Sequence, residues 1–175
     1  STENWKRPKA EVDSIMNLLR NYLDNVVNYK DENIVTRFIG DIAGLDQDII
    51  DKMDHIEQSS KDSTGMVLNI AVNYGGRDEL VHAVQVLSKK ALQGEISPDD
   101  ITEESVAGSL YTAGQPDADL IIRPSGESRL SNFLMWQSAY SELIFMDVLW
   151  PDFKPAHMDQ AIREFNNRNR RFGGI

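Results

Sequence analysis

The chain has 175 residues, of which 41% are hydrophobic and 26% are charged, and its formal net charge is −10. It contains no cysteine, which excludes disulfide bonds, thiolate catalysis and metal sites with cysteine ligands. No apolar run approaches the ~20 residues of a membrane span, and the acidic charge disfavours non-specific binding to nucleic acid. The length predicts a single globular domain over residues 1–175.

The first half of the chain predicts two helices and two strands. Apolar residues recur at helical spacing over 8–27, and a proline stands where that helix begins. A short run rich in β-branched residues at 34–39 is typical of a strand, and apolar residues over 49–56 indicate a second helix. The run 66–72 is almost continuously apolar, as expected of a strand that is covered on both faces.

The second half continues the alternation of helices and strands. In chain order it predicts a turn at 73–77, a helix over 80–91, a Ser-capped short helix after 97–100, a strand at 119–123, a loop at 124–132, a helix capped by Ser131 and running to 140, a strand at 142–147, and a last helix from Pro155 to Gly173-Gly174. This alternation predicts an α/β fold with a mostly parallel central sheet flanked by helices.

Ligands of such sheets bind beyond the carboxyl ends of the strands. Polar, glycine-bearing loops follow two predicted strands, NYGGR (73–77) and RPSGESRLSN (123–132). The opening stretch STENWKRP (1–8) resembles a third strand-end loop whose strand is missing from the sequence. We therefore expect the N-terminal strands of the fold to be absent, and residues 1–5 to be mobile or held by other molecules.

The stretch after the third predicted strand is the strongest candidate site. Arg123 and Arg129 flank a turn, and Ser131 is predicted to lead into a helix. Guanidinium groups and a helix N-terminus suit a polyanion, and Gly126 lets the backbone approach it closely. The alternative is an ordinary strand–helix turn in which the arginines pair with Glu127 or other nearby acids.

Three other residues are candidate functional residues because of their side-chain chemistry and their place in the sequence. Arg77 follows a double glycine at the start of a predicted helix, where a cation opposes the helix dipole unless an anion is bound. Glu142 begins an otherwise apolar strand, so its carboxylate needs a metal ion or an arginine as partner. Trp5 lies in a polar loop, where its large ring needs something to cover. The residues alone leave the first two cases open.

Several stretches then recur in a fixed order: STENWKRP (1–8), NYGGR (73–77), IIRPSGESRLSNFLMWQSAYSEL (121–143), DVLWPDF (147–153) and RNRRFGG (168–174). Together they resemble the cis-prenyltransferases, and most closely the bacterial undecaprenyl diphosphate synthases. The resemblance implies the cis-prenyltransferase fold and the condensation of isopentenyl diphosphate with farnesyl diphosphate. The product would be a long cis-polyprenyl (undecaprenyl) diphosphate for cell-wall lipid carrier synthesis. It also implies Mg²⁺ dependence, a homodimer and a cytoplasmic location with membrane contact through the product.

The resemblance assigns roles to the candidate residues of the second half. Arg123 and Arg129 would take part in catalysis and, with Ser131, would bind the diphosphate of isopentenyl diphosphate. Glu142 would help to hold Mg²⁺. The C-terminal motif at 168–174 would lie at the homodimer interface near the active site.

The resemblance assigns the opening stretch to a mobile loop that covers the substrates. Ser1, Trp5 and Arg7 would bind substrate there, and Asn4 would lie close to the proton-transfer step. Arg77 of the NYGGR motif would also bind substrate. The helix that follows the loop would line one wall of a hydrophobic tunnel for the growing chain.

The sequence departs from the family in two places. Pro124 stands where the family usually has threonine, which we expect to cause only a local adjustment. The D-G-N-G-R-W-A loop is absent; in the family it binds the farnesyl diphosphate head group and carries an aspartate needed for catalysis and Mg²⁺ binding. We therefore expect a C-terminal portion of a cis-prenyltransferase domain that is inactive on its own.

Two other functions are compatible with part of the sequence. A non-catalytic partner subunit of a heteromeric prenyltransferase would keep the fold but lose active-site residues. The retained set argues against it: Arg123, Glu127, Arg129, Ser131 and Glu142. A generic phosphate- or nucleotide-binding α/β domain would explain the arginines but not the ordered set of motifs.

Overall fold

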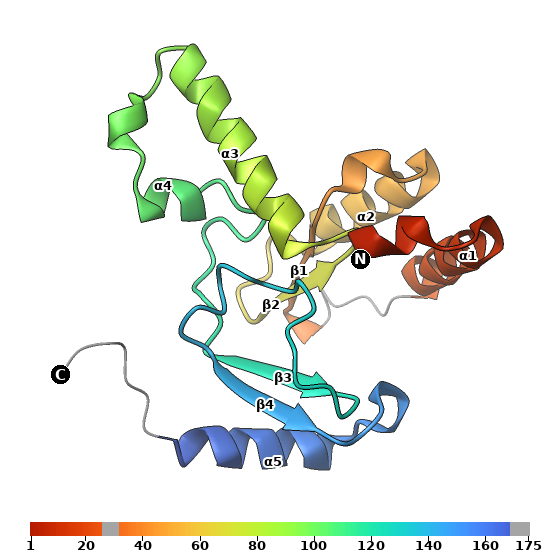
Figure 1. The fold of residues 1–175 in the computed structure, drawn as a ribbon. Helices are drawn as coiled ribbons and strands as arrows, with labels where there is room; N and C mark the ends of the chain where they lie inside the picture. Colours follow the sequence, from red (N-terminus) through yellow and green to blue (C-terminus); the bar gives the residue numbers. More distant parts are fainter. Residues whose placement is uncertain (26–31, 169–175) are drawn as a thin grey trace. The chain divides into compact units, whose positions relative to one another are not determined.

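The computed structural model describes residues 1–25 and 32–168 (Figure 1). They belong to two compact units, Ser1–Ala113 and Gly114–Ile175. The single domain expected from length stays a prediction. The predicted end of the first helix at 26–27 and most of the C-terminal motif, 169–174, lie outside the described residues.

The first unit contains, in chain order, η1 (Thr2–Lys6), α1 (Lys9–Asn25), β1 (Val35–Ile39), η3 (Ile42–Gly44), α2 (Gln47–Ser60), β2 (Val67–Ala71), α3 (Gly76–Leu92), η4 (Pro98–Asp100) and α4 (Glu103–Ala107). β1 and β2 pair in parallel, with Val35 opposite Val67 and Ile39 opposite Ala71. The predicted helices and strands of this half are therefore confirmed, apart from their exact ends. Ser97 caps a 3-10 turn, and the short helix predicted after it is α4.

The core of this unit lies where α1 and α2 pack beside β1. Its buried side chains are Leu23, Leu45, Ile49 and Met53. Ile49 and Met53 are one helical turn apart on α2, so both side chains face the same way. They are 0% and 1% exposed, and burial of each stabilises the fold by roughly 1.5–3 kcal/mol.

Side chains of α2 close the outer edge of β1. The Thr36 N–H donates to Ser60 Oγ at 3.0 Å, and the Phe38 N–H donates to Glu57 Oε1 at 2.6 Å. An edge strand whose N–H groups are satisfied in this way does not offer them to another chain. On the side of β1 that faces away from β2, the N–H groups of Thr36 and Phe38 are therefore already paired.

The prediction that the strand at 66–72 is covered on both faces is wrong. Met66 is 60% and Val67 is 37% exposed, and Ala71 is exposed as well. Val67 and Ala71 point to the same face of the strand because side chains alternate along it. That face is therefore not fully covered among the described residues, so an apolar run of this kind predicted the strand correctly but not its burial.

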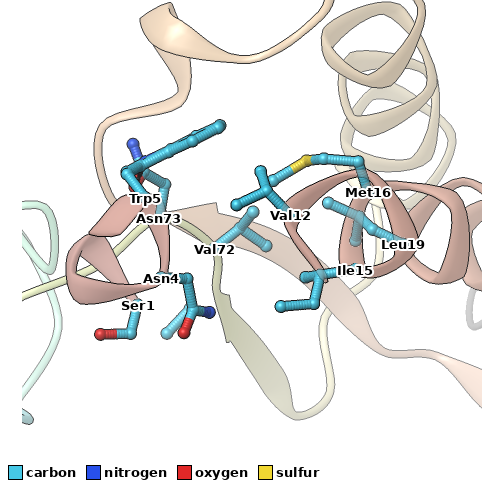
Figure 2. Close-up of a pocket in the computed structure, with 10 residues that line it drawn as sticks. Ser1, Asn4, Trp5, Val12, Ile15, Met16, Leu19, Val72 and Asn73 are labelled. Carbon is cyan, nitrogen blue, oxygen red and sulfur yellow. Dashed lines mark hydrogen bonds between the residues drawn. The ribbon is translucent and has the colours of Figure 1, made fainter. Parts of the chain in front are cut away.

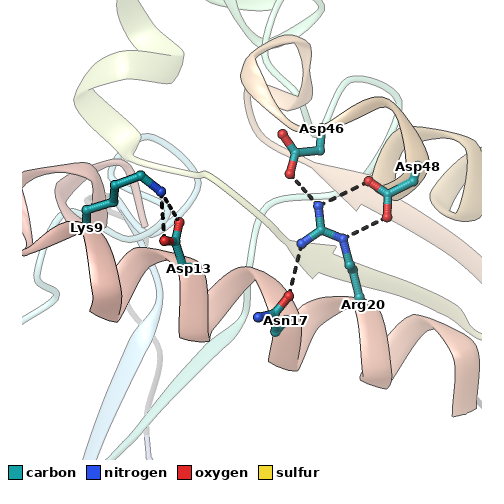
Figure 3. Close-up of polar contacts among 6 residues, drawn as sticks. All are labelled: Lys9, Asp13, Asn17, Arg20, Asp46 and Asp48. Atoms are coloured by element: carbon teal, nitrogen blue, oxygen red, sulfur yellow. Dashed lines mark hydrogen bonds and ion pairs between the residues drawn. The ribbon is translucent and has the colours of Figure 1, made fainter.

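Arg20 fastens α1 to the start of α2 (Figure 3). Its guanidinium donates to the Asp48 carboxylate at 2.7 and 3.2 Å and to Asn17 Oδ1 at 3.2 Å, and it also pairs with Asp46. The hydrogen bond to Asp48 is the largest cause of a raised pKa at Arg20, and it lowers the pKa of Asp48. The contact holds α1 against the core.

We expect Asp48→Asn to lower the free energy of unfolding at pH 7, because an amide carries no charge to pair with Arg20. The folded pKa of Asp48 lies below its unfolded value, so this contribution is present above about pH 4 and is lost as the pH falls through the folded pKa. Urea unfolding of both proteins from neutral to acidic pH measures the difference. Asp54→Asn, at an exposed position on the same helix, is the control. A difference that did not change with pH would contradict the assignment.

The second unit contains β3 (Leu120–Pro124), β4 (Glu142–Met146), η5 (Trp150–Asp152) and α5 (Pro155–Asn166). β3 and β4 pair in parallel, with Leu120 opposite Glu142 and Pro124 opposite Met146. The core residues Ile144, Met146 and Ala161 join β4 to α5. Pro124 closes β3 without breaking the pairing, so its effect on the backbone is local.

The helix predicted over 131–140 is wrong, since this stretch consists of turns and bends. Ser131, Asn132 and Leu134 have φ values of 50°, 63° and 47°, which belong to the left-handed region and cannot continue a right-handed helix. No helix N-terminus therefore supports an anion at Ser131. Among the described residues, no helix is both long and apolar enough to cross a membrane.

Candidate functional site

The opening stretch is a docked turn in this structure. Residues 2–6 form the 3-10 helix η1, and the Thr2 N–H donates to the Tyr74 carbonyl at 3.2 Å. The Trp5 Nε1–H donates to Asn73 Oδ1 at 2.7 Å. In this structure the NYGGR loop of the same unit, rather than another molecule, holds residues 1–5. Their mobility stays a prediction.

An apolar cavity of about 180 Å³ lies between η1, α1 and the end of β2 (Figure 2). Its walls are Val12, Ile15, Met16 and Leu19 from α1 with Ala71 and Val72, and its polar rim is Ser1, Asn4, Trp5 and Asn73. The α1 residues recur at helical spacing and form one face, as the sequence predicted. The cavity is smaller than the roughly 300–1,000 Å³ of drug-sized sites, so it suits part of an apolar chain.

The structure brings three of the four predicted loop residues together at this rim. Ser1, Asn4 and Trp5 line the cavity. Ser1 also caps η1, because its Oγ accepts from the Glu3 N–H at 3.3 Å. Arg7 does not line the cavity, and its Nη1 pairs with Glu11 at 3.3 Å on the surface of α1. Its predicted contact with substrate stays a prediction.

A buried carboxyl group braces the NYGGR loop from the other side. Glu79, in the first turn of α3, is 1% exposed. Its Oε2 accepts from the Tyr74 hydroxyl at 2.5 Å, and its Oε1 accepts from the Tyr111 N–H at 2.9 Å. Glu79 thus ties the loop and α3 to the segment after α4. Sequence reasoning missed this residue; the only signal was an acid near a helix start, where the dipole favours it.

Tyr111 lies beside this brace and stacks on His82, with ring centroids 4.7 Å apart. Burial raises the pKa of Tyr111 to about 12, and Asp78, Asp41 and Glu79 add to the effect. The phenol is therefore neutral at physiological pH.

Arg77 precedes Glu79 in the first turn of α3 and is exposed. Its predicted substrate contact is not tested by this geometry.

In the second unit Arg123 lies near the carboxyl end of β3, opposite Phe145. Its Nε is buried, and no described residue accepts a hydrogen bond from it. A buried donor without a partner costs about 1–3 kcal/mol. In a protein of net charge −10, such a donor is suited to an anionic ligand.

The loop after β3 is shaped by its backbone rather than by a helix. The Ser125 and Gly126 N–H groups donate to the carbonyls of Val148 and Met146 at 2.7 and 3.0 Å. Gly126 has φ 69°, a conformation that glycine adopts without strain. The loop therefore turns tightly above the carboxyl ends of β3 and β4.

Two further predicted residues belong to this loop. Arg129 is exposed and pairs with Glu127, which is the alternative that the sequence left open. Ser131 is exposed in a left-handed turn. Neither geometry tests a diphosphate contact. Of the three residues predicted to bind the diphosphate, Arg123 alone has a buried polar atom without a partner in the described part of the chain.

Glu142 lies at the amino end of β4, three ladder positions from the residue opposite Arg123, or roughly 10 Å along the strand. It accepts from Arg168 Nη1 at 2.8 Å, and Arg168 also donates to the Leu143 carbonyl at 3.0 Å. The hydrogen bond to Glu142 is the largest cause of the raised pKa of Arg168. The structure therefore shows the ion pair with arginine and does not bring Glu142 together with Arg123.

The described residues do not complete a metal site by themselves. Within them, no three His, Asp or Glu side chains lie together as a metal-binding group. Mg²⁺ commonly binds one or two carboxylates and fills its other positions with substrate phosphates and water. Glu142 therefore suits one position of such a site, and its role as a metal ligand stays a prediction.

Comparison with known proteins assigns the family. The family model described as "Putative undecaprenyl diphosphate synthase" matches residues 1–173. The chain belongs to the undecaprenyl diphosphate synthase family. The isoprenyl transferase of Clostridium tetani is 47% identical over 176 residues, covering 100% of this chain and 69% of that protein. The isoprenyl transferase of Bacillus subtilis is 48% identical over 179 residues, covering 100% and 68%.

Solved structures show the same fold for this member of the undecaprenyl diphosphate synthase family. A lavandulyl diphosphate synthase from Lavandula x intermedia, in complex with dimethylallyl diphosphate, is 35% identical with a TM-score of 0.92, covering 99% of this chain and 75% of that one. A probable undecaprenyl diphosphate synthase from Campylobacter jejuni is 35% identical with a TM-score of 0.85, covering 99% and 79%. The predicted cis-prenyltransferase fold, with parallel strands flanked by helices, is thereby confirmed.

Proposed function

We propose that the protein condenses isopentenyl diphosphate with farnesyl diphosphate into a long cis-polyprenyl diphosphate, the undecaprenyl carrier of cell-wall precursors. The observation that carries this proposal is the apolar cavity beneath η1, in a family whose curated members are named isoprenyl transferases. A nucleotide site needs polar partners for a base and a ribose. A wall of Val12, Ile15 and Leu19 instead suits a hydrocarbon chain.

Arg123 supports the diphosphate half of the proposal. Guanidinium groups bind phosphate oxygens through two parallel hydrogen bonds, and the buried Nε of Arg123 lacks any other acceptor among the described residues. In the proposal, Arg129 leaves Glu127 to add a second cation, and the Ser131 hydroxyl donates to the same diphosphate. The solved neighbour from Lavandula holds dimethylallyl diphosphate, a ligand that also joins an apolar chain to a diphosphate.

The proposed reaction needs a stabilised leaving group and a site that excludes water. An allylic diphosphate ionises when charge on the leaving diphosphate is stabilised, a task that cations in a site of low dielectric perform. The allylic carbocation must then be kept from water, which an apolar wall accomplishes. Asn4 lies on the polar rim of the cavity, and we assign it to the proton-transfer step.

Calorimetric titration of the full-length protein tests the substrate class. Isopentenyl diphosphate should bind measurably, whereas ATP at the same concentration should not, because a phosphate-binding loop for nucleotides is not part of the proposed site. The reverse order of affinity would support the generic nucleotide-binding domain. The relatives reported above are named as transferases, so the comparisons give the non-catalytic partner subunit no support.

The proposal includes Mg²⁺, with Glu142 as one ligand in the substrate-bound protein. We expect Glu142→Gln to raise the Mg²⁺ concentration for half-maximal activity about tenfold or more. Arg168→Met is the matched control, because it removes the same ion pair but keeps the carboxylate. Both variants should unfold more easily, whereas only Glu142→Gln should raise the Mg²⁺ requirement, because Arg168→Met leaves the carboxylate free for the ion. An unchanged Mg²⁺ requirement in Glu142→Gln would restrict Glu142 to the ion pair.

The remaining parts of the proposal concern assembly and location. We assign the protein to a homodimer through the 168–174 motif and to the cytoplasm, with membrane contact through its product. Sedimentation of the full-length protein tests the first assignment, and flotation with phospholipid vesicles in the presence and absence of polyprenyl product tests the last.

A further inference from the structure

One amide side chain connects the opening turn to the ends of both strands of the first unit. The Asn73 Nδ2–H donates to the Asp41 carbonyl at 2.7 Å, and its Oδ1 accepts from the Trp5 Nε1–H at 2.7 Å. A carbonyl only accepts and an indole only donates. The bond to Asp41 therefore fixes which end of the amide faces Trp5, and an aspartate or a leucine at this position could not make both bonds.

The backbone around Asn73 is rigidly placed. Asn73 has φ 46°, a left-handed conformation that asparagine tolerates better than most residues. The Asp41 N–H donates to the Asn73 carbonyl at 3.2 Å. The two segments after β1 and β2 approach so closely that a Cβ on Gly40 would lie 2.0 Å from the Val72 carbonyl oxygen. The side-chain amide of Asn73 therefore projects from a place where the ends of β1 and β2 are in close backbone contact.

Trp5 itself is 44% exposed, so burial of its ring contributes only part of the docking energy of η1. Two bonds that join η1 to the loop are Trp5 Nε1–H to Asn73 Oδ1 and Thr2 N–H to the Tyr74 carbonyl. η1 and its N-cap Ser1 supply three of the four residues of the polar rim: Ser1, Asn4 and Trp5. Loosening these bonds therefore opens the cavity toward solvent.

We infer that Asn73 is a positioning residue that holds η1 closed over the apolar cavity by orienting the indole of Trp5. The pair of bonds Trp5–Asn73 and Asn73–Asp41 is called the Asn73 latch. The closed position of η1 follows from the chain's own contacts. The ligand that the latch retains, a prenyl chain, rests on the proposed function.

Trypsin cleavage after Lys6 in the full-length protein measures how often η1 opens, because a docked 3-10 turn does not fit a protease site. Trp5→Phe keeps an aromatic ring, though a smaller one, and removes the N–H donor. Asn73→Gly keeps the left-handed backbone and removes both side-chain bonds. Each should raise the cleavage rate about fivefold, as expected for the loss of one net hydrogen bond when opening is fast. The double variant should be cleaved no faster than Asn73→Gly alone.

Asn33→Gly is the matched control. Asn33 is also left-handed, with φ 57°, and its Oδ1 accepts from the Thr64 N–H at 2.8 Å, in a loop that does not line the cavity. It should be cleaved after Lys6 at the wild-type rate. The latch is refuted if Trp5→Phe and Asn73→Gly behave like this control, or if their effects multiply in the double variant.

Steady-state kinetics separates this inference from the proposed function. A looser η1 should raise the KM for farnesyl diphosphate severalfold in Trp5→Phe and Asn73→Gly, with a smaller change in kcat. If cleavage responds but the wild type makes no polyprenyl product, the latch stands and the proposed function fails. If the wild type is active but cleavage does not respond, the latch fails and the proposed function stands.

Discussion

Arg123→Met is expected to reduce kcat/KM for isopentenyl diphosphate by about 10²–10³ and to leave the unliganded protein as stable as the wild type or more stable. Methionine keeps most of the volume of the side chain but carries no donor. The buried Nε of Arg123 has no acceptor among the described residues, so its removal relieves a desolvation cost in the free protein. Steady-state kinetics and urea unfolding measure the two effects on one sample.

Arg163→Met is the matched control, because Arg163 is an exposed arginine on α5 of the same unit. It should change kcat/KM by no more than about twofold, as for a surface position away from the site. Arg123→Lys should recover only part of the activity, since lysine keeps the charge but loses the planar fork. Full activity in Arg123→Met, or a clear loss of stability, would contradict the assignment of Arg123 to the diphosphate.

Glu79→Ala is expected to lower the free energy of unfolding by about 3 kcal/mol. The substitution removes the carboxylate that accepts from the Tyr74 hydroxyl and the Tyr111 N–H, and it leaves a small cavity. Alanine is a good helix former, so the loss does not come from the propensity of α3. Thermal unfolding should show a decrease of about 10 °C in Tm for a chain of this size.

Glu79→Gln refines this expectation, because it keeps the volume and one acceptor but turns an amide donor toward one of the two partners. Its loss should be roughly half that of Glu79→Ala. Glu95→Ala, which truncates an exposed glutamate of the same unit, should stay within about 0.5 kcal/mol of the wild type. Equal stability of Glu79→Ala and Glu95→Ala would mean that the buried carboxyl group does not brace the NYGGR loop.

Local sequence patterns were sufficient for most of the fold. Strands β1 to β4 follow from short β-branched or apolar runs, and α1 follows from its apolar spacing, because these signals depend on residues close together in the chain. The helix predicted at 131–140 failed for a reason that spacing does not reveal. Ser131 and Asn132 adopt left-handed conformations, which the spacing of apolar residues does not encode.

The residue types of the candidate site could be predicted from the sequence, but the hydrogen-bond partners of these residues could not. Arg123 could be singled out from its place after an apolar strand, and the structure adds that its Nε lacks a partner in the described chain. The role of Asn73 could not be foreseen, because its partner Trp5 lies 68 positions away. Likewise, burial of Glu79 depends on the segment that carries Tyr111, 32 positions further along the chain.

The proposed reaction extends farnesyl diphosphate with isopentenyl units. The most direct measurement is the incorporation of labelled isopentenyl diphosphate by the full-length protein, with farnesyl diphosphate and Mg²⁺, followed by chromatography of the extracted lipids. We expect a long polyprenyl diphosphate whose formation needs both substrates and is lost in Arg123→Met. Binding of both diphosphates without any extended product would contradict the proposed reaction.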